Sequence, residues 1–96
     1  ENFSGEEAVW FGGKPVWVMN YTGRALNKNF SGEFLKESLL LVKEDFPYRG
    51  PLVHNSGEHC YHCTVSGSFE WFRGFEEIFC GGEKTYECYF HGGAVR

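Results

Sequence analysis

The chain has 96 residues, with 13 acidic and 9 basic side chains and a formal net charge of -4. Aromatic residues make up 19% of it, which excludes a disordered segment, because such segments lack the apolar surface that offsets chain entropy. The basic residues are scattered, and no apolar run approaches the ~20 residues that span a bilayer. We therefore expect a single domain over residues 1–96 that binds neither nucleic acid nor membranes.

Residues 3–23 predict a β-hairpin. Gly12-Gly13 is a two-residue turn signal, because glycine accepts the positive φ that tight hairpin turns need. Such a turn places residue 10 opposite 15, residue 8 opposite 17 and residue 7 opposite 18. The face predicted to enter the core, by the period of two along a strand, consists of Ala8, Trp10, Trp17, Met19 and Tyr21.

A helix is predicted next. Ser31 is a good N-cap, since its hydroxyl can accept from an unpaired backbone N–H, and Phe30 and Leu35 occupy the hydrophobic staple positions around it. Pro47 is predicted to end the helix, because it lacks a donor and disfavours helical backbone at Phe46. The predicted buried stripe consists of Phe34, Leu35, Leu39 and Val42.

The rest of the chain predicts a second, larger β unit. Residues 47–51 (PYRGP) form a rigid turn, a polar loop runs through Gly57, and residues 59–65 form a strand. Ser66-Gly67 is predicted as a turn, and residues 69–72 lead into a hairpin around Gly81-Gly82. Its predicted core face consists of Phe79, Tyr86, Cys88 and Phe90, with Glu77 as the one charged member. On the other face, Glu87 is predicted to lie opposite Glu76. The expected fold is α+β, an antiparallel sheet with one helix between two hairpin units (ββ-α-βββ).

The two hairpins look like copies of one unit. Residues 3–23 and 72–92 align without a gap at an offset of 69, and 6 of the 21 positions are identical. Four of the six identical positions are glycines, two of them in the predicted turn, and the conservative positions include strand residues. Because only the second unit has a strand before its hairpin, the repeat predicts a further strand before residue 1. We expect an incomplete domain whose open edge is covered by that strand or by a second copy in a homodimer.

Seven segments in order carry a resemblance to a known family: FSGEEAVW, PVWVMNYTGR, FLKESLLLV, PYRGP, YHCTVSG, FEWFRGFEEI and YECYFHGG. Together they resemble a small bacterial domain family of unknown function, which also occurs behind helix-turn-helix domains in XRE-type regulators. The resemblance implies an additional helix and strand in front of residue 1. With that part restored, the order of helices and strands resembles a circular permutation of the duplicated units in GyrI-like effector domains. Those domains bind small molecules between their halves, and the similarity is an analogy of fold.

The four cysteines permit two readings. An even number in a short chain allows two disulfides in an oxidising compartment, but the aromatic content can build a core without them, so we expect free thiols and a cytoplasmic location. Residues 59–63 also suggest zinc through Cys60, His62 and Cys63. Neighbours on a strand alternate faces, however, so these three cannot all converge, and a solvated or buried role is the alternative.

Two further sets could bind a ligand. Glu7 and Glu76 are equivalent in the repeat, so a pseudo-two-fold axis could bring the two carboxylates together at a cleft; the alternative is exposed strand carboxylates. A second set combines aromatic and polar residues, several at equivalent strand ends, with core packing as the alternative for its tryptophans. The predicted ligand-binding residues are Glu7, Trp17, Asn20, Tyr21, Arg49, Glu76, Tyr89 and His91.

The sequence holds no nucleophile elbow, phosphate loop or zinc-protease motif. We therefore expect a binding module for a small molecule or peptide that needs no cofactor and has no catalytic residues. The alternatives are a structural or oligomerisation domain, and a zinc module or enzyme that uses the strand of residues 59–63.

Overall fold

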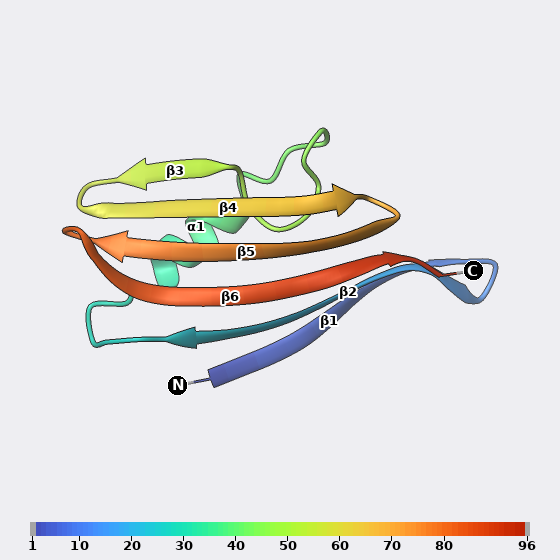
Figure 1. Cartoon of the computed structure of the whole chain (residues 1–96), viewed down its shortest axis with the longest axis horizontal. Coiled ribbons are helices and arrows are strands. Elements are labelled where there is room, and N and C mark those ends of the chain that lie inside the picture. The colour runs from blue at the N-terminus through green and yellow to red at the C-terminus, as the bar shows by residue number, and fades with distance from the viewer. Residues whose placement is uncertain (1, 96) are drawn as a thin grey trace.

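The computed structural model describes residues 2–95, in which six strands and one helix follow the order ββ-α-ββββ. All neighbouring strands are antiparallel, in the order β1-β2-β6-β5-β4-β3 within one sheet (Figure 1). This confirms the predicted α+β class. The elements are β1 (Asn2–Phe11), β2 (Lys14–Ala25), α1 (Gly32–Leu39), β3 (Val53–Ser56), β4 (His59–Ser68), β5 (Trp71–Cys80) and β6 (Glu83–Ala94).

Both glycine turns are where the sequence predicts them. Gly12 and Gly13 have φ of 58° and 79°, and Gly81 and Gly82 have φ of 59° and 84°. Positive φ at both central residues belongs to the type I′ turn, whose twist matches that of the flanking strands. The two turns therefore close two long hairpins of the same kind, β1–β2 and β5–β6.

The predicted register within each hairpin is correct for the two pairs next to the turn and wrong beyond them. A β-bulge shifts the pairing between Val9 and Trp10, so that Val9 faces Trp17. The same shift occurs between Ile78 and Phe79, where Ile78 faces Tyr86. A bulge adds one unpaired residue to one strand. Beyond the bulge the register is shifted by one residue, so the side chains of the opposite strand point to the faces opposite to those predicted.

The exchange corrects the predicted core. Trp10 is 63% exposed, and Ala8 is exposed as well, although the alternation of the sequence predicts both in the core. In β5, Ile78 is buried, whereas Phe79 is only half-buried. The core faces of β2 and β6 are predicted correctly. Their buried residues include Trp17, Met19, Tyr86, Cys88 and Phe90.

The identical residues of the two hairpins form the same cross-strand contacts. The Phe90 ring lies over Gly74 so closely that a Cβ on Gly74 would come within 2.1 Å of the ring. Tyr21 covers Gly5 in the same way, with 2.3 Å between the imagined Cβ and the tyrosine oxygen. Each hairpin also has the reciprocal pair, in which an aromatic ring of the first strand covers a glycine of the second: Phe3 over Gly23 and Phe72 over Gly92.

We expect Gly74→Ala to lower the free energy of unfolding by about 1–3 kcal/mol, because the new methyl group must displace the buried Phe90 ring. Urea denaturation measures this loss. The matched control is Gly32→Ala at the start of α1, where a Cβ meets nothing within 4 Å, so alanine should be neutral or stabilising there. Equal unfolding midpoints for the two variants would contradict the packing described here.

The helix starts as predicted and ends early. Ser31 caps it by accepting from the Phe34 N–H at 3.1 Å. It ends at Leu39 rather than near Pro47, because the following apolar residues find no core: Leu40 is 83% exposed and Val42 is 45% exposed. The buried Phe34 attaches the helix to the sheet. Its ring stacks on His54 of β3 and His59 of β4, with centroid distances of 5.5 and 5.0 Å.

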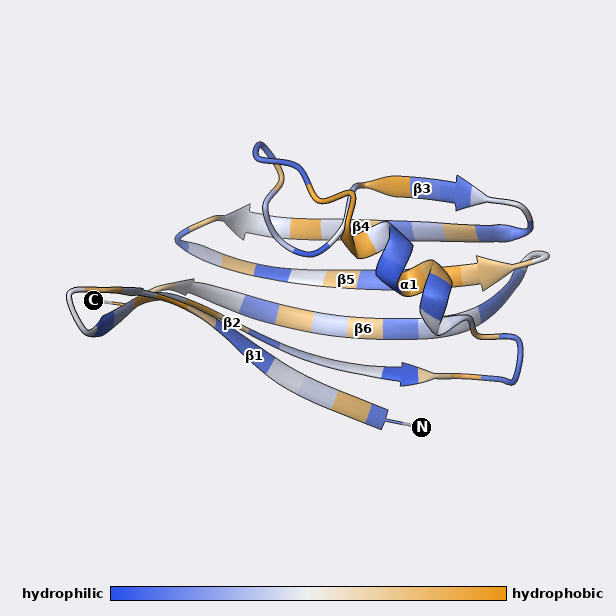
Figure 2. Ribbon diagram, turned by 180° about the vertical axis from the view of Figure 1, so that it is seen from behind, coloured by the Kyte–Doolittle hydropathy of each residue, from blue (hydrophilic) through white to orange (hydrophobic). Residues whose placement is uncertain are grey.

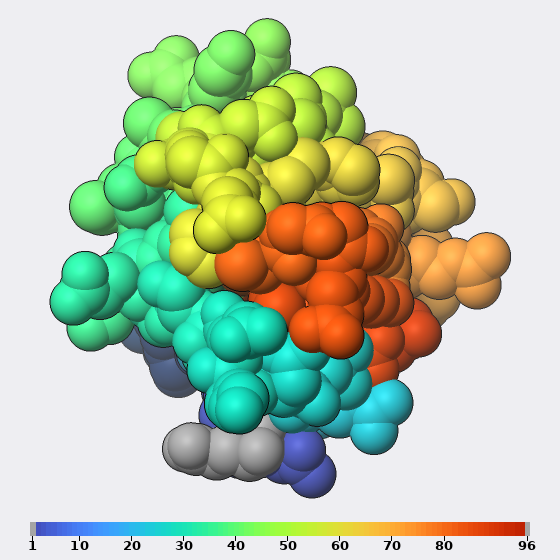
Figure 3. Space-filling model, turned by 90° about the vertical axis from the view of Figure 1, so that its left-hand side faces the viewer, coloured from blue at the N-terminus to red at the C-terminus, as the bar shows by residue number. Residues whose placement is uncertain are grey.

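Two segments differ from the predicted secondary structure. The polar loop before Gly57 contains β3, which pairs with β4 although its residues show no apolar alternation. The turn predicted at Ser66-Gly67 lies instead at residues 69–70, because β4 continues to Ser68. Figure 3 shows the end of the molecule where the turns of β3–β4 and β5–β6 and the chain before α1 pack together, joined by the hydrogen bonds from Gly81 N to Glu58 O and from Leu26 N to Thr85 O.

The sheet has one covered and one open face. Figure 2 shows α1 and the loop after it lying over β4, β5 and β6 on one face. Figure 1 looks onto the opposite face, which no helix covers. Within residues 2–95, β1 pairs only with β2, so the homodimer predicted to cover this edge stays a prediction. The same residues contain no helix that is long and apolar enough to cross a membrane.

Candidate functional site

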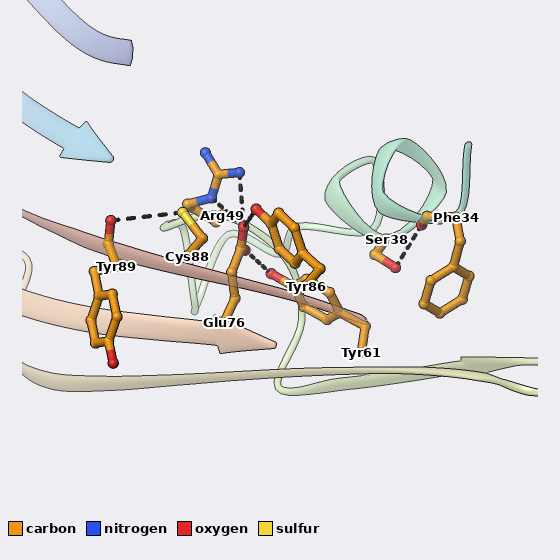
Figure 4. A network of polar contacts seen from close by, with 8 residues as sticks. All are labelled: Phe34, Ser38, Arg49, Tyr61, Glu76, Tyr86, Cys88 and Tyr89. Atoms are coloured by element: carbon orange, nitrogen blue, oxygen red, sulfur yellow. Dashed lines mark hydrogen bonds and ion pairs between the residues drawn. The ribbon is translucent and has the colours of Figure 1, made fainter. Parts of the chain in front are cut away.

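The covered face buries an ionic network around Glu76. The Glu76 carboxylate, 0% exposed, accepts from Arg49 Nε at 2.9 Å and from the Tyr86 hydroxyl at 2.7 Å. The Tyr61 hydroxyl donates to the other carboxylate oxygen, and the Arg49 guanidinium lies 4.4 Å from the Tyr21 ring centroid. Figure 4 shows the two tyrosines and the arginine converging on the carboxylate. Every group in the network has a partner, as buried charges require.

The network changes the titration of its neighbours. Burial alone would lower the pKa of Arg49, but the Glu76 carboxylate more than offsets this and raises it. Burial, together with the negative charge of Glu76, raises the pKa of Tyr61 and of Tyr86. The same two causes raise the pKa of the Cys63 and Cys88 thiols to about 11, because both flank Glu76 in the cross-strand register. All five groups are therefore held in fixed protonation states at neutral pH.

The two equivalent glutamates do not meet. Glu76 lies in the interior strand β5, whereas Glu7 lies on the edge strand β1, with β2 and β6 between them. Glu7 is exposed and lines a cavity of about 440 Å³, in which Arg49 forms part of the wall. The bulge also corrects the predicted partner of Glu76, which is Cys88 rather than Glu87.

The predicted like-charge contact exists on the open face instead, between Glu77 and Glu87. Lys84 lies between them, with its Nζ 3.4 Å from Glu77 and 3.1 Å from Glu87. Arg24 adds a contact of 2.6 Å to Glu87. The hydrogen bonds from Arg24 and Lys84 lower the pKa of Glu87. These two cations explain why the carboxylates of Glu77 and Glu87 can be neighbours.

A groove runs across the open face of β2, β6, β5 and β4. It consists of two adjoining cavities of about 720 and 630 Å³, which share Ser66, Arg73 and His91 in their walls. We call this surface the open-face groove. Its first cavity has a floor of small residues and an indole wall: Gly67, Gly92, Gly93, Ala94 and Trp71. Its second cavity is lined by Phe75 and Tyr89, whose ring centroids are 4.8 Å apart.

The polar groups of the open-face groove lie in one row. Asn20 faces His91, His91 faces Arg73, and Arg73 faces Ser66 in the cross-strand register. In the part of the chain that the structure describes, the side chains of Asn20, Arg73 and His91 form no hydrogen bond or ion pair. Three unpaired polar groups beside exposed aromatic rings are what a preformed ligand site offers.

The eight predicted ligand-binding residues are thus divided between the two faces. Glu7, Tyr21, Arg49 and Glu76 lie on the covered face, where Glu76 has no surface that a ligand could touch. Trp17 is a core residue of this face, stacked on Phe69 at 4.6 Å with its Nε1 donating to the Phe69 carbonyl. The remaining three line the open-face groove: Asn20, Tyr89 and His91.

The three residues considered for zinc are divided as well. Cys60 and His62 are half-buried on the open face, and Cys63 is buried on the other. Among residues 2–95, no group of three histidine, cysteine or carboxylate side chains could hold a metal ion. All four cysteines are free thiols.

Sequence reasoning missed Trp71 and Arg73. The period of two along β5 would place both on the face opposite Phe72, but the slipped register assigned that face to the core at Phe79. In the structure, Trp71 has the largest side chain of β5 and is 83% exposed, and this exposed indole marks the groove.

Comparisons with known proteins give a family. No curated protein and no solved structure shows significant similarity to the chain. A family model described as a domain of unknown function, DUF5680, matches residues 1–95. The match spans both hairpins, the helix and β3 and β4. The chain therefore belongs to the DUF5680 family, a small domain family of unknown function.

Proposed function

We propose that this domain binds a small molecule in the open-face groove, and that the ligand joins a flat apolar ring to an anionic group. The observation that carries the proposal is the unpaired row of Asn20, His91 and Arg73 beside Trp71, which is 83% exposed. The buried network of the covered face is satisfied within the fold, so it leaves few groups for a ligand. The open face, by contrast, combines aromatic surface with unused donors.

The chemistry of the groove indicates the class of ligand. A planar ring can stack on the Trp71 indole, and the floor of glycines lets it approach the backbone. The Arg73 guanidinium suits a carboxylate or phosphate, which it can bind through two parallel hydrogen bonds. Asn20 and His91 follow at a strand spacing of about 4.8 Å each and can bind further polar atoms of the same molecule.

One carboxylate orients this ligand. Glu6 faces Asn20 on β1 and continues the polar row at the end opposite to Arg73. An anionic group near Glu6 would be repelled, so the anion lies at the Arg73 end. The overall charge of -4 does not prevent this, because exposed charges act over about 8–10 Å at physiological ionic strength.

The test is a thermal-shift screen of the full chain with aromatic carboxylates and phosphates, compared with inorganic phosphate and with aromatic amines. We expect only compounds that join ring and anion to raise the melting temperature, because only these can contact both Trp71 and Arg73. A ligand at 100 times its Kd stabilises the folded state by about 2.7 kcal/mol, which raises the melting temperature. Stabilisation by aromatic amines instead would contradict the assigned charge, and no stabilisation by any compound would contradict the proposal.

Matched variants localise the effect. Trp71→Ala and Arg73→Gln should each abolish the ligand-induced shift and leave the melting temperature of the free protein nearly unchanged, because both side chains are exposed. Phe11→Ala, at a residue 79% exposed outside the groove, and Lys28→Gln are the controls and should retain the shift. An undiminished shift in Trp71→Ala and Arg73→Gln would show that binding occurs elsewhere and would contradict the assignment to the groove. The cytoplasmic location and the bacterial and regulatory context of the domain stay predictions.

A further inference from the structure

A pair of side chains on the open face, Cys60 and His62, lies outside the open-face groove. Cys60 and His62 are two residues apart on β4, so both side chains point to the same face. The Cys60 sulfur lies 3.1 Å from His62 Nε2. This is a close contact for sulfur, and it gives the thiol an acceptor for its proton.

A third side chain orients the imidazole. Glu77 faces His62 across β4 and β5, and its carboxylate is 3.9 Å from His62 Nδ1. A carboxylate on that side favours the proton on Nδ1, which leaves Nε2 free to accept from the thiol. Lys84, 3.4 Å from the other Glu77 oxygen, fixes the carboxylate from the opposite side.

We propose that Cys60 is a reactive thiol that peroxides oxidise, with His62 as its base and Glu77 as the positioning residue. A thiol next to a base that a third side chain orients is the usual arrangement of an activated cysteine nucleophile. Cys60 is only half-buried, so small oxidants can reach it. The neighbouring Cys63, although in the same strand, points into the core and is 1% exposed.

The step balances with hydrogen peroxide as the oxidant. The Cys60 sulfur attacks one peroxide oxygen, a sulfur–oxygen bond forms and the oxygen–oxygen bond breaks. The thiol proton passes to His62 Nε2 and then to the leaving hydroxide, which becomes water. Sulfur is oxidised to a sulfenic acid and the peroxide is reduced.

The four cysteines of the chain allow an internal comparison. Cys80 is the matched control, because it is also half-buried and free but forms no side-chain hydrogen bond within residues 2–95. The full chain is treated with hydrogen peroxide, the sulfenic acid is trapped with dimedone, and each cysteine is quantified by peptide mass spectrometry. We expect Cys60 to be labelled faster than Cys80 by at least about tenfold, and the buried Cys63 and Cys88 to remain unlabelled.

Two variants separate this chemistry from mere exposure. His62→Gln keeps a polar side chain of similar reach on the open face and should lower the Cys60 rate to that of Cys80. Glu77→Gln should lower it by a smaller factor and alter how the rate depends on pH, since it removes the charge beside the imidazole. Circular dichroism confirms that both variants fold. A Cys60 rate equal to that of Cys80, or unchanged in His62→Gln, would overturn the proposal.

Discussion

Arg49→Met is expected to lower the free energy of unfolding by about 3–5 kcal/mol, the cost of leaving a buried charge without its partner. Glu76 is 0% exposed and cannot reach water, so the lost guanidinium has no substitute. Small domains are stable by only about 5–15 kcal/mol in total. The variant should therefore be partly unfolded at moderate urea concentrations, which a denaturation curve followed by circular dichroism measures directly.

The surface ion pair of the same chain is the matched control. Arg24 and Glu87 are 2.6 Å apart, but the Arg24 side chain is 58% exposed. Exposed pairs contribute about 0–1 kcal/mol, so Arg24→Met should change stability very little. Comparable losses in the two arginine variants would contradict the role assigned to burial.

A combined variant tests the network as a unit. Replacing Arg49 by Met, Glu76 by Leu, and Tyr61 and Tyr86 by Phe removes both charges and both hydroxyls together. It leaves no buried polar group of the network without a partner, and apolar replacements of similar volume are often neutral. We expect it to be more stable than Arg49→Met alone.

The second large effect is a loss of stability in alkali. The pKa of the Cys63 and Cys88 thiols is raised from 9.0 to about 11 in the folded chain, first by burial and then by the Glu76 charge. Between pH 9 and pH 11 these thiols are ionised in the unfolded state but largely protonated in the folded one, which favours unfolding. Their contribution is thus complete below pH 9 and decreases by about 2 kcal/mol per thiol by pH 11.

Urea denaturation between pH 8 and pH 11 under reducing conditions measures this decrease. Tyr61 and Tyr86 add to it in the same direction, because their pKa is raised as well. In Cys63→Ala/Cys88→Ala the decrease between pH 9 and pH 10 should be much shallower. A stability that is constant up to pH 11, or an equal slope in this variant, would contradict the prediction.

Local chemistry made part of the fold predictable. Glycine pairs marked both type I′ turns, and Ser31 marked the start of the helix, because each depends on a few adjacent residues. The bulges at Val16 and Thr85 carry no comparable marker, and a slip of one residue was enough to place Trp10 and Phe79 on the wrong face. The strand β3 escaped prediction because its pairing depends on β4 and not on its own polar sequence.

The candidate site was less predictable for a reason that lies in the sheet order. The alignment of the two hairpins identified Glu7 and Glu76 as equivalent, but one lies on the edge strand and the other in the middle of the sheet. Only the position in the sheet decides which of them is buried. The arginine that neutralises Glu76 comes from the loop after α1, which lies outside both repeats.

The proposed ligand of the open-face groove joins a ring to an anionic group. Titration of the isotope-labelled full chain with phenyl phosphate, followed by backbone amide NMR, locates such binding residue by residue. We predict saturable shifts confined to Asn20, Ser66, residues 71–75 and residues 89–93, with no response to inorganic phosphate at the same concentration. Shifts that cluster instead around Glu7, Tyr48 and Arg49, or the absence of saturable shifts, would contradict the assignment.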